Sequence, residues 1–129
     1  MSEPILYIDT SEVREGKLEE LKAAIEELVR FIEANVPRAI TYNIYLNESG
    51  TRMTVAQIHP DSASLESHMK VGASAFHKFR DLVTLSTIEV YGKPSESLLE
   101  QLAQKARMLG NATVEEHEHQ AGFARFGVP

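Results

Sequence analysis

Apolar residues recur at intervals of three and four over the early part of the chain, which is the spacing of an amphipathic helix. Glutamates and Lys22 occupy the positions between them, and the apolar residues are Leu18, Leu21, Ile25, Leu28 and Ile32. Val36-Pro37 ends the segment, because a residue that precedes proline avoids the helical region. The pattern predicts a helix over residues 17–35 with one apolar face.

Four other segments have the alternation or the β-branched composition of strands, at residues 5–13, 39–46, 52–59 and 84–91. The second of them alternates most regularly, and its apolar side chains are Ile40, Tyr42, Ile44 and Leu46. Asn47 to Gly50 then predicts a tight turn, so the second and third strands are expected to form a hairpin.

A second helix is expected after Pro60-Asp61-Ser62, which supplies a stop for the strand and an N-cap for the helix. Gly72 is expected to break or bend this helix into two pieces. The elements follow one another as strand, helix, strand, strand, helix, strand. This is the split β-α-β order of ferredoxin-like α+β folds, in which both helices cover one face of an antiparallel sheet.

The remaining residues predict a C-terminal extension over about residues 93–129, after a core over about residues 4–92. Ser97 to Glu100 fits a capping box at the start of a third helix, and Gly110 ends that helix. Residues 113–126 alternate loosely, as a last strand would, although Gly122 interrupts the pattern. No linker, repeat or change of composition divides the chain, so one domain over residues 1–129 is expected.

Composition and charge narrow the classes of function. The net charge of −6 disfavours nucleic acid and anionic membranes as partners. The chain has no cysteine, which excludes disulfides, thiolate nucleophiles and cysteine-bound metals. The first residues lack the basic and apolar regions of a signal peptide, and no apolar run approaches the ~20 residues of a membrane span. A cytoplasmic protein is therefore expected.

The second face of the predicted sheet has no helix to cover it. It carries aromatic, amide and ionisable groups, which suit packing against a second sheet around a cavity better than full exposure. Which side of the first and third strands faces the interior stays open, because both sides of each strand are partly apolar. The pattern predicts a homodimer in which two sheets enclose a pocket.

Three stretches resemble the antibiotic biosynthesis monooxygenase family of dimeric α+β barrels. They are Gly-Lys-Leu-Glu-Glu-Leu at residues 16–21, Ala-Ile-Thr-Tyr-Asn-Ile-Tyr at residues 39–45 with its hairpin partner, and the segment Gln57 to His68. Together they cover about residues 5–92. The chain departs from the family at Gln57, where a glutamate is usual, and at Arg38-Ala39, where a glycine often stands.

The resemblance implies a cofactor-independent monooxygenase whose substrate supplies the electrons. A small aromatic, quinol or polyketide-like molecule would lose a proton, and the resulting anion would react with O₂ in a dry pocket. Such a reaction uses neither metal nor flavin, so no cofactor is expected. Some members of the superfamily degrade haem with the help of a tryptophan, and the absence of tryptophan argues against that reaction here.

Six residues are candidates for this chemistry. The two catalytic candidates are His68, as general base or hydrogen-bond donor, and Asn43, which would hold a substrate oxygen. The substrate-binding candidates, which would line the pocket, are Tyr7, Tyr45, His59 and Gln57. Each candidate also has a structural interpretation, as a histidine packed between helix and sheet, a half-buried sheet tyrosine or a polar group at a solvated strand end.

His117 and His119 raise the question of a metal, because side chains at i and i+2 share one face of a strand. Such a site needs further ligands, and no partner stands at a suitable spacing. A charged, exposed strand without a metal is therefore expected. The stripe of leucines in the third helix and the segment Phe123 to Phe126 are interpreted as packing surface.

Two other classes of function stay open. The same cavity would serve a non-catalytic ligand-binding or stress-associated barrel, and it would also serve a cofactor-free isomerase or cyclase that needs one acid or base. Oxygen uptake, ligand-induced stabilisation without turnover, and product formation without oxygen uptake distinguish the three.

Overall fold

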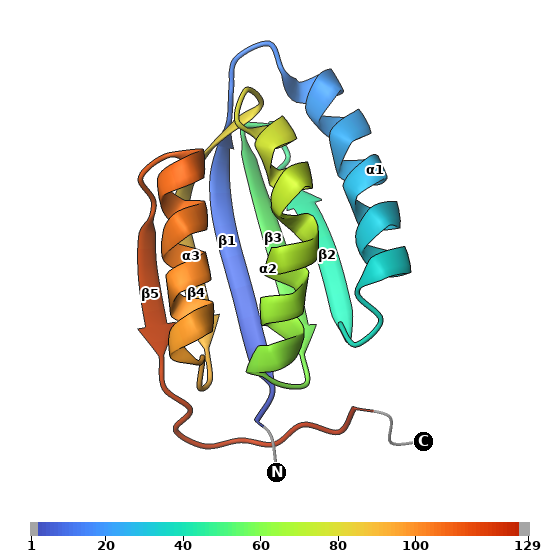
Figure 1. The fold of residues 1–129 in the computed structure, drawn as a ribbon. Coiled ribbons are helices and arrows are strands. Elements are labelled where there is room, and N and C mark those ends of the chain that lie inside the picture. The colour runs from blue at the N-terminus through green and yellow to red at the C-terminus, as the bar shows by residue number, and fades with distance from the viewer. Residues whose placement is uncertain (1–2, 127–129) are drawn as a thin grey trace.

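A computed structural model describes residues 3–126 and arranges them as a five-stranded sheet with three α-helices on one face (Figure 1). The elements in chain order are β1 (Ile5–Val13), α1 (Leu18–Asn35), β2 (Thr41–Leu46), β3 (Arg52–His59), α2 (Ser62–Phe76), the 3₁₀ turn η1 (His77–Phe79), β4 (Val83–Tyr91), α3 (Glu96–Leu109) and β5 (Thr113–His117). The predicted ferredoxin-like α+β fold is confirmed.

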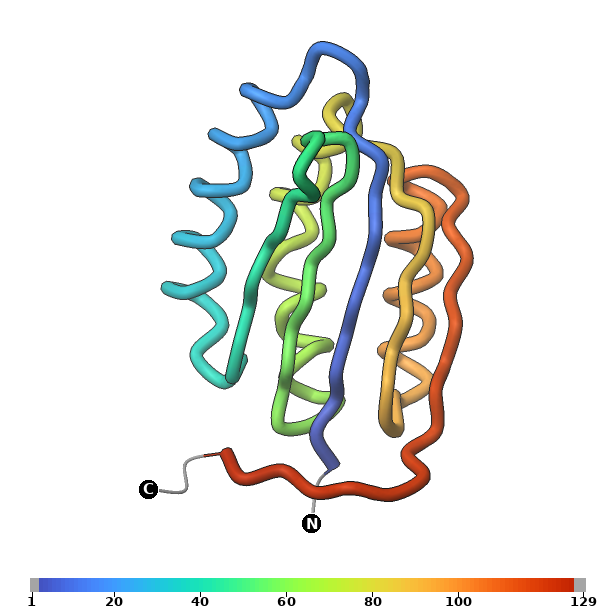
Figure 2. Tube along the Cα trace, turned by 180° about the vertical axis from the view of Figure 1, so that it is seen from behind, coloured from blue at the N-terminus to red at the C-terminus, as the bar shows by residue number. Residues whose placement is uncertain are grey.

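The strands are ordered β2-β3-β1-β4-β5 across the sheet. β1 lies at the centre and pairs antiparallel with both β3 and β4, and β2 pairs antiparallel with β3. β5 lies parallel to β4, with α3 as the crossover that a parallel pair requires. The last strand is shorter than expected, and the chain beyond it runs across the lower end of the sheet (Figure 2).

Alternation in β1 and β3 places their odd-numbered side chains under the helices. The buried positions are Ile5, Tyr7, Asp9 and Ser11 in β1 and Met53, Val55, Gln57 and His59 in β3. The sequence left open which side of these two strands faces the interior, and the structure shows that it is the odd-numbered side. Polar as well as apolar side chains are therefore buried. No helix of the described residues covers the other face of the sheet (Figure 2), where Leu6, Ile8 and Ile58 are half-buried.

Side-chain caps fix the starts of α2 and α3. The Asp61 carboxylate accepts a hydrogen bond from the Ser64 N–H at 2.9 Å, and the Ser95 hydroxyl accepts one from the Leu98 N–H at 3.0 Å. The prediction of a capping box at Ser97 was wrong by two residues, because Ser97 already lies inside the first turn of α3. The cap residues anchor the N-terminal ends of the two helices that cover the centre of the sheet.

The prediction that Gly72 breaks the second helix was also wrong. α2 is continuous from Ser62 to Phe76, and Gly72 is buried within it. A Cβ atom at position 72 would lie 2.9 Å from Cζ of Phe76, closer than side-chain carbons pack. The glycine therefore makes room for the Phe76 ring against the helix, and that ring forms one wall of the candidate site.

None of the helices in the described part of the chain is long and apolar enough to cross a membrane.

Candidate active site

Polar side chains are concentrated between the sheet and the helices. Among residues 3–126, the buried polar or charged side chains are Asp9, Ser11, Gln57, His59, Ser64, His68 and Lys105. Burial of such groups costs free energy unless they are hydrogen-bonded or paired. Most of them belong to two hydrogen-bonded networks, one joining β1 to α3 and the other joining β3 to α2.

The first network is centred on the ammonium group of Lys105 in α3. Its Nζ donates to the Tyr7 hydroxyl at 2.8 Å and to Asp9 Oδ2 at 3.0 Å, and the Tyr7 hydroxyl donates to the same oxygen at 2.5 Å. Nζ also lies 4.4 Å from the centre of the Phe76 ring. Burial, followed by the charge of Asp9, raises the pKa of Tyr7 well above its usual value, so its phenol stays protonated.

The second network runs from α2 into β3 and back to α2. Ser64 Oγ lies 2.7 Å from His59 Nδ1, His59 Nε2 lies 2.8 Å from Gln57 Oε1, and Gln57 Nε2 lies 3.3 Å from His68 Nε2. An amide oxygen only accepts and an amide nitrogen only donates. His59 therefore donates through Nε2, and His68 accepts through Nε2 from the Gln57 amide.

The direction of this chain fixes the tautomer of His68. Burial, followed by the charge of Lys105, lowers the pKa of His68 well below its usual value, so its imidazole is neutral. With Nε2 accepting, the single ring proton sits on Nδ1. This Nδ1 is buried and has no hydrogen-bond partner in the structure. The site thus presents an unused N–H donor in the protein interior.

Aromatic rings flank His68 on two sides. Its ring centre lies 5.3 Å from that of Tyr42 and 5.7 Å from that of Phe76. A cavity of about 30 Å³ borders on Tyr42 and Phe76 and also on Asp9 and Lys105. That volume holds about one water molecule, so a small aromatic ligand requires the surrounding side chains to move apart. The arrangement combines a cation, a carboxylate, a neutral donor and flat apolar walls.

Four of the six predicted site residues, namely Tyr7, Gln57, His59 and His68, are buried together between the sheet and the helices. The structure does not bring Asn43 or Tyr45 to them. Asn43 is the register partner of Ala56, on the face of the sheet without helices, and Tyr45 is 57% exposed there. The inward position next to Gln57 belongs to Tyr42. Asn43 and Tyr45 therefore lie on the opposite face of the sheet from His68.

Sequence reasoning missed Tyr42 and Lys105 as members of the site. A signal for Lys105 was present, because it falls three residues after Leu102 and four before Leu109, on the apolar face of α3. A charged residue within such a stripe is buried only when it has a partner. Its partners Asp9 and Tyr7 stand at the other end of the chain, so the spacing alone did not identify them.

His117, whose spacing from His119 raised the question of a metal in the sequence, lies at the end of β5. It contacts β4 on the outer face of the sheet, with Nε2 3.1 Å from Glu89 Oε1 and its ring stacked on Tyr91 at 4.2 Å. Glu89, Glu115 and His117 each place one possible metal-ligand atom within 4.8 Å of the others. This cluster lies on the opposite side of the sheet from Lys105 and His68.

No family model and no curated protein matches the chain. Among solved structures, MupZ from Pseudomonas fluorescens matches with a TM-score of 0.74 and 19% identity over 99% of each chain. Rv0793 from Mycobacterium tuberculosis matches with a TM-score of 0.61 and 15% identity, over 72% of this chain and 97% of its own. A protein from Bacteroides thetaiotaomicron provisionally named an antibiotic biosynthesis monooxygenase has a TM-score of 0.58 and 17% identity, over 65% of this chain and 84% of its own.

These identities are low, and the similarity is one of fold. MupZ spans the C-terminal extension as well as the core, whereas the other two leave more than a quarter of this chain unmatched. The chain therefore has a ferredoxin-like α+β fold similar to that of the protein provisionally named an antibiotic biosynthesis monooxygenase, and a fifth, parallel strand extends its sheet.

Proposed function

We propose that the chain is a cofactor-independent monooxygenase that acts on a small aromatic, quinol or polyketide-like molecule between the sheet and the helices. The observation that supports this most is the buried and unpaired Nδ1–H of His68. It lies in the same polar interior as the ammonium group of Lys105. Burial, followed by the Lys105 charge, lowers the pKa of His68. Preorganised donors of this kind stabilise an oxyanion far better in a dry site than in water.

Each group in the cluster has a role in the proposed reaction. The substrate hydroxyl or activated C–H group loses its proton to Asp9, whose carboxylate is held by Lys105 and Tyr7 and borders on the cavity. His68 Nδ1–H and Lys105 stabilise the resulting anion, and the rings of Tyr42 and Phe76 hold its flat carbon skeleton.

The oxidation balances without a cofactor. When a methylene group is converted to a carbonyl, the carbon gains one oxygen atom from O₂ and loses two hydrogens. The second oxygen atom leaves as water with those two hydrogens. The substrate thus supplies all of the electrons that O₂ accepts.

An oxygen electrode tests the reaction class with purified protein and a panel of hydroquinones, catechols and anthrones, without added metal or flavin. The expected result is uptake of one O₂ for each molecule oxidised, with no accumulation of hydrogen peroxide, and no product under nitrogen. Heat-denatured protein serves as the control for autoxidation. Turnover that is equally fast under nitrogen would contradict the proposed oxygenase.

A cofactor-free isomerase or cyclase is the second candidate, because the cluster contains a carboxylate and imidazoles, which are groups that transfer protons. Such a set is sufficient for proton transfer without O₂. Product formation under nitrogen would favour this reaction. Stabilisation by an aromatic ligand without any turnover would instead indicate a binding protein.

The proposed enzyme works as a homodimer whose second copy covers the open face of the sheet. Half-buried Leu6, Ile8 and Ile58 lie on this face, beside Tyr45, which is 57% exposed. Apolar patches of this kind mark protein–protein contact surfaces. Sedimentation at micromolar concentration is expected to give a dimer, and Tyr45→Lys should shift the protein toward monomer. A wild type that sediments as a monomer would contradict the dimer.

A further inference from the structure

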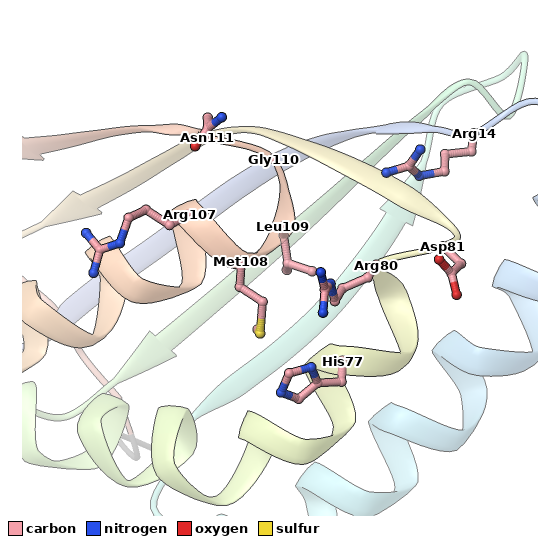
Figure 3. Close-up of a pocket in the computed structure, with 9 residues that line it drawn as sticks. All are labelled: Arg14, His77, Arg80, Asp81, Arg107, Met108, Leu109, Gly110 and Asn111. Atoms are coloured by element: carbon pink, nitrogen blue, oxygen red, sulfur yellow. The ribbon is translucent and has the colours of Figure 1, made fainter.

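Three arginines line an open pocket of about 530 Å³ at the end of the fold that is uppermost in Figure 1, and Figure 3 shows this pocket in close-up. They come from three separate segments, since Arg14 follows β1, Arg80 follows η1 and Arg107 lies in the last turn of α3. Arg80 extends over the middle of the pocket in Figure 3, with Arg14 and Arg107 on either side of it and His77 below. Segments far apart in the sequence thus bring like charges to one place.

The charge of this pocket is opposite to that of the protein as a whole. The chain has a net charge of −6, yet three arginines face a single lining carboxylate, that of Asp81. In the part of the chain that the structure describes, none of the three guanidinium groups forms a salt bridge or a side-chain hydrogen bond. Mutual repulsion among unpaired guanidinium groups is relieved when an anion binds between them.

The backbone around the pocket is held in place without a ligand. The Arg14 N–H donates to the Leu82 carbonyl at 2.9 Å, which ties the end of β1 to the segment that carries Arg80. On the other side, Gly110 has a φ of 147°, and a Cβ there would lie 2.9 Å from the Leu85 carbonyl oxygen. The turn after α3 is therefore packed closely against β4, and the pocket is preformed.

The pocket adjoins the candidate active site. Leu109 lines both the arginine pocket and the buried cavity beside Asp9 and Lys105. Leu109 is buried and is the side chain that the two spaces share. A ligand anchored at the arginines would reach the cavity only if side chains there moved apart, because the cavity alone holds about one water molecule. This placement suits an elongated molecule with one anionic end.

We propose that the arginine pocket binds an anionic group of the substrate, a carboxylate or a phosphate, while the reacting part lies beside Lys105. The inference rests on the proposed function and specifies its substrate class. We expect Arg80 and Arg14 to contribute most of the binding free energy of the anion. Arg107 contributes less, because a cation in the last turn of a helix already interacts with the helix dipole.

Calorimetric titration with inorganic phosphate and with benzoate tests the site directly. We expect at least one of these anions to bind, with Kd raised about ten-fold by Arg80→Gln and by Arg14→Gln. Arg30→Gln is the matched control, because Arg30 is exposed on α1 and does not line the pocket. Binding that survives the Arg14→Gln/Arg80→Gln double substitution, or that Arg30→Gln weakens equally, would overturn the proposal.

The test of anion binding at the arginines can be separated from the test of the oxygenase reaction. Where the wild type oxidises a carboxylated and a neutral version of one ring system, Arg80→Gln should raise KM about ten-fold for the carboxylated one alone. A wild type that oxidises a substrate but binds neither phosphate nor benzoate would reject the arginine site and leave the oxygenase. Anion binding by an inactive protein would reject the oxygenase and leave the site. Phenyl phosphate compared with benzoate shows which anion is preferred.

Discussion

Replacing Lys105 with methionine is expected to destabilise the protein by about 3–5 kcal/mol, because it leaves the buried Asp9 carboxylate without its cation. Tyr7 still donates to that carboxylate, but one neutral hydrogen bond does not replace an ion pair. Native domains are stable by only about 5–15 kcal/mol, so the loss is a large fraction of the total. Urea denaturation followed by circular dichroism measures the change in the free energy of unfolding.

Two further variants show whether the effect comes from the ion pair. Lys70→Met removes an exposed lysine from α2 and should change the stability by less than about 0.5 kcal/mol. The double variant Asp9→Asn/Lys105→Met removes both charges together and should recover much of the loss, since no buried charge is left unpaired. Equal stability of Lys105→Met and Lys70→Met would contradict the buried pair.

Stability is expected to fall as the pH is lowered from about 6.5 to about 4, because His59 is buried in its neutral form. Burial lowers the pKa of His59 from 6.5 to about 4, with Asp61 opposing this shift and Arg38 adding to it. Between these values the unfolded chain binds a proton that the folded chain does not, so the free energy of unfolding rises with pH. The expected loss across the window is on the order of 2 kcal/mol.

Denaturation midpoints at pH 7, 6, 5 and 4 measure this loss in the wild type and in His59→Gln. The variant keeps a polar side chain at the position but cannot take up the proton, so its stability should depend less steeply on pH. Carboxylates that titrate in the same range contribute equally to both proteins and cancel in the comparison. Parallel profiles would show that His59 is not the group responsible.

The helices and strands were predictable because their apolar residues keep a regular spacing. α1 and the β2–β3 hairpin follow from local patterns alone, as do the ferredoxin-like order and the presence of a third helix. The parallel pairing of β5 with β4 was not predictable in this way. It depends on how α3 crosses the sheet, which is a property of the packed molecule.

The candidate site was only half predictable, for a physical reason. The alternation of residues along a strand normally assigns its polar side chains to the solvent-facing side. Tyr7, Asp9 and Gln57 nevertheless point under the helices. They are stable there because partners on α2 and α3 satisfy them. The Lys105 contacts span 96 and 98 residues of sequence, so no local pattern reveals them. His68 was a candidate from the sequence, with packing between helix and sheet as its alternative interpretation, and the structure places it in the buried cluster. Asn43 and Tyr45, the other candidates on β2, lie on the opposite face of the sheet.

The proposed chemistry takes place on the helix-covered face of the sheet, and the oxygen-uptake assay on two variants tests this location most directly. His68→Ala removes the unpaired donor beneath α2, and Asn43→Ala removes the amide predicted as catalytic on the opposite face. Loss of one oxyanion donor typically lowers kcat by about 100-fold or more. We expect that loss in His68→Ala, with Asn43→Ala close to the wild type. Full activity in His68→Ala, with the loss in Asn43→Ala, would place the reaction on the other face and contradict this account.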